Sequence, residues 1–257
     1  MLECTRLRLL MSIAAIAATC GWSTATAEEF RVENKVYIDR EAEPRATSTT
    51  IFVDGVVYDY LNQPNEITIF DSTRGRFVLL DVTRHVRMEL TAEQVSAMSE
   101  RIKVWAEKQA DPYLNFLARP QFDEQWDETT GDLSLASKWI TYQLKTTEVE
   151  NPAIARQYRE FSDWYCQLNT AVNPGSRPPF SRLLVNESLA RHARFPTEVQ
   201  LTVRSQGGVF ARKTVIRSEH QLISRLVESD RARVSQTHQY IAMFPQVGLG
   251  EYLKSER

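Results

Sequence analysis

The segment from residue 30 to residue 90 is a series of short β-type runs joined by short turns, with no helical run between them. The clearest turn is formed by Asp54 and Gly55, which stand between two runs rich in β-branched residues. An Asp-Gly pair in this position is typical of a two-residue β-hairpin, because both central residues adopt positive φ. Strands that follow one another without a helix pair antiparallel, so the segment predicts an antiparallel meander. The expected strands are 30–32, 36–38, 50–53, 56–60, 66–70, 76–80 and 84–90.

Strand periodicity returns in the second half of the chain. Residues 133–147 carry apolar groups on both faces of the expected strand, which is typical of a strand inside a sheet. Beyond Pro196 further strands follow, and we expect them to complete one sheet with the N-terminal strands. These later strands are expected over 198–204, 209–217 and 220–227, with a turn at 206–208 between the first two.

Helical patterns separate the two groups of strands. Thr91 and Gln94 form a capping box, which marks the start of a helix, and an apolar stripe follows at helical spacing. Further helical segments are expected to begin at Asp111, Asn151 and Pro179. The chain therefore predicts an α+β fold, a curved antiparallel sheet or half-open barrel with about three covering helices, in a single domain over residues 28–257.

The first 27 residues have the layout of a secretory signal peptide. Arg6 and Arg8 precede an apolar run of about 10 residues, and an A-x-A cleavage site ends at Ala27. The run is shorter than the roughly 20 residues that span a bilayer, so we expect no integral membrane span. We expect export to the periplasm or cell envelope, in soluble form after cleavage near Ala27. A lipid anchor at Cys20 is the alternative, although the residues before it match a lipobox poorly.

The cysteine content argues against an intramolecular disulfide, and the net charge argues against nucleic-acid binding. Cleavage would leave Cys166 as the single cysteine, so no intramolecular disulfide is expected, and its apolar helical neighbours predict that it is buried. The 31 Lys and Arg residues against 33 Asp and Glu give a formal net charge of −2. Because the chain has no excess of positive charge, we expect no binding to nucleic acid.

The order of these elements resembles the periplasmic lipoprotein-carrier (lipoprotein-sorting) superfamily. The resemblance rests on the signal peptide, the meander with its turn at Asp54 and Gly55, the helix after Leu90, and the closing strands that follow Phe195 and Pro196. In that family an incompletely closed antiparallel barrel wraps around helices and encloses an apolar cavity for acyl chains. The resemblance implies a concave sheet with an apolar interior in this chain.

Candidate catalytic and metal-binding residues are few. The G-x-S-x-G, Walker A and G-x-G-x-x-G motifs do not occur, and the histidines lack the zincin spacing. His220 follows Ser218 and Glu219, but neighbouring strand residues point to opposite faces. The acidic cluster at 123–128 lies in the segment 121–130, which we expect to be a loop, and it lacks the spacing of a calcium loop. We expect no catalytic residue, no metal site and no cofactor; an enzyme would require His220 or His238 to converge with carboxylates in a cleft.

Aromatic and methionine side chains are the one collective feature with a functional interpretation. They form either an ordinary core between sheet and helices or the lining of an apolar pocket. The first interpretation predicts an envelope structural or interaction protein with a filled core and a protein partner. The second predicts a non-catalytic protein that binds a lipid or another apolar small molecule. The ligand-binding residues would then include Met98, Trp105, Phe116, Trp139 and Phe161.

Overall fold

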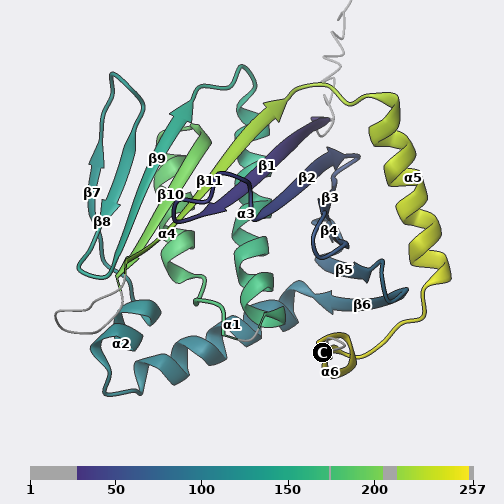
Figure 1. Ribbon diagram of the computed structural model, residues 1–257, viewed down its shortest axis with the longest axis horizontal. Helices are drawn as coiled ribbons and strands as arrows, with labels where there is room; N and C mark the ends of the chain where they lie inside the picture. The colour runs from purple at the N-terminus through teal and green to yellow at the C-terminus, as the bar shows by residue number, and fades with distance from the viewer. Residues whose placement is uncertain (1–27, 174, 205–212, 255–257) are drawn as a thin grey trace, which may run out of the picture.

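The computed structural model describes residues 28–173, 175–204 and 213–254 (Figure 1). Its α+β fold is built on one curved antiparallel sheet of 11 strands, which confirms the predicted fold class. The sheet does not close, because the edge strands β6 and β7 do not pair with each other. The strand order is β6-β5-β4-β3-β2-β1-β11-β10-β9-β8-β7. The strands are β1 (Phe30–Ile38), β2 (Ala46–Val53), β3 (Val56–Leu61), β4 (Glu66–Asp71), β5 (Arg76–Asp81), β6 (Val86–Thr91), β7 (Asp123–Trp126), β8 (Leu133–Ala136), β9 (Ile140–Thr147), β10 (Phe195–Arg204) and β11 (Lys213–Ile223).

Tight turns set the order of the first six strands, each of which pairs with the next along the chain. Asp54 and Gly55 have φ values of 52° and 74° and join β2 to β3, so the predicted hairpin is confirmed. His85, in the turn between β5 and β6, also adopts a positive φ, of 55°. Short turns of this kind leave no room for a crossover helix, and the strands form a meander.

Strand β1 joins the N-terminal strands to the C-terminal strands. It pairs with β2 on one side and with β11 on the other. Asn34 on β1 stands opposite Ser48 on β2 and opposite His220 on β11. Residues directly opposite in an antiparallel pair share a face of the sheet. Side chains from β1 and β2 therefore meet a side chain from β11, far away in the sequence, at the middle of the sheet.

The helices begin where side-chain caps satisfy their first backbone amides. The Thr91 hydroxyl accepts from the Gln94 amide at 3.2 Å, and the Gln94 side chain accepts from the Thr91 amide at 2.8 Å, which confirms the capping box. The Asn151 side chain accepts from the Ala153 amide at 2.9 Å. No helix in the described ranges is long and apolar enough to cross a membrane. The helices are α1 (Ala92–Glu107), α2 (Pro112–Ala118), α3 (Pro152–Val172), α4 (Phe180–Arg191), α5 (Glu228–Met243) and α6 (Leu249–Tyr252).

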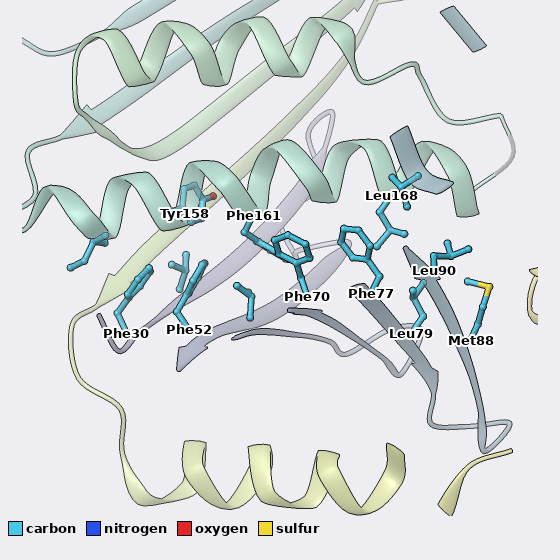
Figure 2. Close-up of a cluster of buried hydrophobic side chains, with 14 of the residues drawn as sticks. Phe30, Phe52, Phe70, Phe77, Leu79, Met88, Leu90, Tyr158, Phe161 and Leu168 are labelled. Carbon is cyan, nitrogen blue, oxygen red and sulfur yellow. The ribbon is translucent and has the colours of Figure 1, made fainter. Parts of the chain in front are cut away.

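One face of the sheet packs against α3 and α1. Side chains from β1 to β6 point toward α3, whose Tyr158, Phe161 and Leu168 meet them (Figure 2). Phe52 stacks on Phe30 at a ring-centroid distance of 4.1 Å and meets Phe161 edge to face at 5.9 Å. A second cluster lies between β8, β9, α2 and α4 and includes Phe116, Leu133, Leu135, Ile140, Tyr142, Val185 and Leu189.

Helix α5 covers the opposite face of β2 to β5, as the pale yellow helix below the sheet in Figure 2 illustrates. Tyr58 and Tyr60 alternate along β3 with the residues that face α3, and they hydrogen bond to His238 and Thr237 of α5 at 2.9 Å and 3.0 Å. The sheet is therefore covered on both faces in its N-terminal part.

Three expectations about elements after residue 120 were wrong. The segment 121–130, expected to be a loop, contains the short edge strand β7. Residues 133–147 form two strands, because the Ser137 amide and hydroxyl both donate to the Ile140 carbonyl and close a turn between them. The strand expected at 220–227 is the end of β11, which is followed by α5. The expected turn at 206–208 and the signal peptide at 1–27 lie outside the described residues.

Candidate functional site

A cavity of about 410 Å³ lies between α3 and the strands β1, β2, β3 and β11. Its volume falls within the range of roughly 300–1,000 Å³ that is common for small-molecule sites. The central position of β1 in the sheet brings the two groups of strands together at this place. Apolar lining comes from Val36, Ala46, Leu61, Tyr158, Phe161, Tyr165 and Cys166, and polar lining from Asn34, Thr47, Ser48, Thr50, Asp59, Ser162, Asn169, Arg182, Ser218 and His220.

A second hollow of about 330 Å³ adjoins the cavity on the side of β9 and β10. The two spaces share lining residues, namely Cys166, Asn169, Arg182 and Ser218. The far side of the second hollow is lined by Val199, Leu201 and Ile216, among others. A ligand longer than the cavity could therefore extend into this hollow past Arg182.

His220 is the centre of a hydrogen-bond network in the wall of the cavity. Its Nδ1 lies 2.8 Å from Asn34 Oδ1 and 3.0 Å from the Tyr158 hydroxyl. An amide oxygen only accepts, so the network assigns the ring proton to Nδ1. Nε2 then accepts from the Ser218 hydroxyl at 2.9 Å. The neutral imidazole is thus held in one orientation by residues from β1, β11 and α3.

Hydrogen bonds connect His220 to a buried carboxyl group, Asp59. The Asn34 amide nitrogen donates to Thr50 Oγ1 at 3.1 Å, and the Thr50 hydroxyl donates to Asp59 Oδ1 at 2.7 Å. Asp59 faces α3 because Tyr58 and Tyr60 on either side of it face α5. Burial raises the pKa of Asp59, while hydrogen bonds from Thr50, Ser48 and Tyr165 oppose that rise.

Burial also shifts the pKa of His220, Tyr158 and Cys166 in the cavity wall toward the neutral form of each side chain. It lowers the pKa of His220 to about 3, with a further contribution from the positive charge of Arg182. It raises the pKa of Tyr158 and of the Cys166 thiol to about 12. His220, Tyr158 and Cys166, which line the same cavity as Arg182, are therefore neutral near pH 7.

The network has the order of groups found in some nucleophilic enzymes, since Ser218 is bonded to His220 and His220 to Asn34. A general base acts best when its pKa lies near the working pH. An imidazole with a pKa of about 3 accepts the proton of a serine hydroxyl poorly. The geometry thus suits holding a ligand better than activating Ser218.

The five residues expected to bind a ligand do not gather at one place. Phe161 lines the cavity, and Met98 packs against the same core cluster outside the lining. Phe116 and Trp139 meet at a centroid distance of 5.0 Å in the second cluster, under α2. Trp105 lies on the outside of α1 with 56% of its surface exposed. The helical stripe that contains Met98 and Trp105 is thus only partly buried.

The polar residues of the cavity were missed as a group from the sequence. In the sequence, His220 stood out together with Ser218 and Glu219. In the structure His220 hydrogen bonds to Ser218, which lies two positions away on the same face of β11. Glu219 points to the other face. His238 lies on the far side of the sheet with Tyr58. One signal for this site is present in the sequence of β3. Side chains alternate between the two faces of a strand, and Asp59 occupies a position on the face that points toward α3.

The acidic cluster at 123–128 makes structural contacts. Glu124 accepts from the Ser188 hydroxyl at 2.6 Å and pairs with Arg191 of α4. The Asp127 side chain accepts from the backbone amides of Thr129 and Thr130 in the turn between β7 and β8. Within the described ranges, no group of three or more His, Cys, Asp or Glu side chains is arranged to hold a metal ion.

Comparisons with known proteins give a weak structural likeness and no match in sequence. No model of a known protein family matches this sequence. A search of curated proteins also gives no match. Among solved structures, the chain is similar to the LolA superfamily protein NE2245 from Nitrosomonas europaea, with a TM-score of 0.29 and 7% identity, over 79% of this chain and 89% of that chain. What the chain binds therefore has to be inferred from its own cavity.

Proposed function

We propose that this chain is an exported, non-catalytic protein that binds a lipid or another apolar small molecule between the sheet and α3. The observation that carries the proposal is the cavity of about 410 Å³ beneath α3. A core that only stabilises a fold is packed as densely as an organic crystal, with few voids larger than a water molecule. A space of this size on the inner face of the sheet suits a ligand.

The lining supports an elongated ligand with a mainly apolar body. Val36, Leu61 and Phe161 supply an apolar wall from β1, β3 and α3. Polar groups lie mainly in the network around His220 and near Arg182, with Thr47 and Asn169 as further polar lining, and such groups can orient an otherwise apolar ligand. The low pKa of His220 supports binding over acid/base chemistry at this site.

Uptake of a fluorescent fatty acid by the purified chain tests the binding proposal. Ala46 lines the cavity, and Ala46→Phe would fill part of it. Ala97 is exposed on α1, so Ala97→Phe is a control of the same size change. We expect the wild type and Ala97→Phe to bind the probe and Ala46→Phe to bind it at least about ten-fold more weakly. A wild type that binds no probe, and that carries no lipid by native mass spectrometry after purification from its own host, would refute the proposal.

Export is supported by the signal-peptide pattern of residues 1–27. Mass spectrometry of the chain purified from its host tests it. A chain that begins at Glu28 supports cleavage after Ala27, and a diacylated Cys20 supports the lipid-anchored alternative. A chain that retains residues 1–27 would contradict export by this route.

A second candidate function, an envelope protein that binds a protein partner, is favoured by the outer face of α1. Val104 and Trp105 are adjacent there and are 38% and 56% exposed. Exposed aromatic residues are enriched where proteins bind each other. Affinity purification from the host envelope tests this function. One partner that is captured by the wild type and lost with Trp105→Ser would favour it, and equal capture by both would count against it.

A further inference from the structure

Arg182 is half-buried beside the cavity and has no carboxylate partner within ion-pair distance among the described residues. Among the described residues, its guanidinium makes one hydrogen bond, to the Ser162 hydroxyl at 3.4 Å. A guanidinium group has five N–H donors, so most of the Arg182 donors have no partner among the described residues. An arginine removed from bulk water with free donors is suited to a carboxylate or phosphate oxygen.

Asp163, an acidic side chain on which Arg182 acts electrostatically, is already engaged with other groups. Arg182 contributes to the electrostatic environment of Asp163, but Asp163 accepts from Asn186 Nδ2 at 2.7 Å and pairs with Arg159 Nε at 3.4 Å. Asp59, the carboxyl group inside the cavity, is buried and bonded to Thr50. Burial raises the pKa of Asp59, so its charged form is disfavoured relative to that of an exposed aspartate.

The position of Arg182 also indicates how a ligand would lie. Arg182 lines both the cavity and the adjoining hollow, so it stands where the two spaces meet. Apolar side chains line the spaces on either side of it, with Leu61 and Phe161 in the cavity and Leu201 and Ile216 in the hollow. An anion at Arg182 would therefore be attached to an apolar chain that runs along the inner face of the sheet.

We propose that the site selects single-chain amphiphiles with an anionic head group, a carboxylate or a phosphate, and that Arg182 binds this head group. The inference rests on the proposed binding function and adds the class of ligand to it. A single chain fits because the cavity, at about 410 Å³, is near the lower end of the usual range of pocket volumes. The Ser162 hydroxyl, which accepts from the guanidinium, lines the same cavity as Arg182.

Calorimetric titration of the full chain with three probes of equal chain length tests the proposal. The probes are dodecanoate, dodecyl phosphate and dodecanol, which differ in the charge of the head group. A hydrogen bond to a charged group contributes about 1.5–3 kcal/mol, so at least one anion should bind about ten-fold or more tightly than the alcohol. The comparison of the two anions shows which head group the site prefers, and either preference supports the proposal.

Two substitutions show whether Arg182 is the source of the selectivity. Arg182→Gln should remove the preference for the anions while dodecanol binds as before, and Arg182→Lys should keep part of it because the charge remains. Arg225→Gln removes a charge from an exposed position between β11 and α5 and should leave the preference unchanged. An anion preference that persists in Arg182→Gln would overturn the assignment to Arg182.

The wild-type titrations also separate the failure of this inference from that of the proposed function. Equal binding of all three probes would refute anion selectivity and leave the apolar-ligand function standing. Binding of none of the three would count against both. Because this comparison needs only the wild-type chain, it decides the inference even if a variant fails to fold.

Discussion

Asp230, in the first turn of α5, accepts two hydrogen bonds at 2.8 Å from the guanidinium nitrogen Nη1 of Arg31 on β1. The Asp230 side chain is only 8% exposed, and its second oxygen also accepts from the Val227 amide at 2.9 Å. One carboxylate therefore both starts α5 and attaches this helix to the middle strand of the sheet.

Replacing Asp230 should detach α5 from the sheet. Asp230→Ala leaves Arg31 with only the more exposed Glu33 as a counter-ion. Removal of one partner from a buried pair typically costs about 3 kcal/mol of unfolding free energy, and Glu33 should reduce this loss. The neighbouring pair Arg231–Glu29 is more exposed, so Arg231→Ala serves as a control and should have a much smaller effect. Urea denaturation followed by circular dichroism measures both. Equal losses in the two variants would contradict a special role for Asp230.

His220 should make the protein less stable as the pH falls below neutral. Its pKa is about 3 in the folded chain against an ordinary value of 6.5, so between these values the unfolded state binds a proton that the folded state does not. The stability that His220 contributes is complete above pH 6.5 and is lost as the pH falls toward 3. The loss in unfolding free energy should be on the order of a few kcal/mol.

Urea denaturation at several pH values tests this dependence. The variant His220→Gln should have a flatter pH profile between the two values than the wild type. Ser218→Ala, which removes one hydrogen bond to the ring but keeps the imidazole, should retain the wild-type slope. Identical slopes in wild type and His220→Gln would show that His220 is not held in the neutral form.

Asp59 should have the opposite pH dependence. Its pKa is raised in the folded chain, so its contribution to stability is complete below the ordinary value of 3.8 and is lost as the pH rises through the folded value. Asp59→Asn keeps an oxygen that can accept from Thr50 and removes the charge. The variant should therefore gain stability relative to the wild type as the pH is raised, when both are measured by urea denaturation. Asp132→Asn, at an exposed position, controls for the loss of a charge.

Local signals in the sequence were sufficient for much of the fold. The hairpin at Asp54 and Gly55 and the capping boxes and caps at Thr91 and Asn151 depend on neighbouring residues, and all are present in the structure. Helix α5 was missed because it has few apolar residues, and the contacts that hold it come from Arg31, Tyr58 and Tyr60, far away in the sequence. Such contacts are set by the fold of the whole chain.

The polar lining of the cavity could not be predicted for a related reason. Asn34, Asp59, Arg182 and His220 are spread over most of the chain, and they meet only because β1 pairs with both β2 and β11. A polar residue within a strand is usually taken as facing water. In β3, however, both faces are covered by helices, so Asp59 faces inward between two tyrosines that face α5.

Cys166 offers a probe of ligand binding, since its thiol lines both the cavity and the adjoining hollow. Burial raises the pKa of this thiol to about 12, and the thiolate is the reactive form. At neutral pH we therefore expect iodoacetamide to alkylate Cys166 slowly in the folded chain and rapidly in urea, as measured by mass spectrometry of the peptide that contains it. Dodecanoate should slow the reaction of the folded chain further, if the ligand lies beside Arg182. Alkylation at the same rate with and without ligand, at concentrations where calorimetry detects binding, would place the ligand outside this cavity.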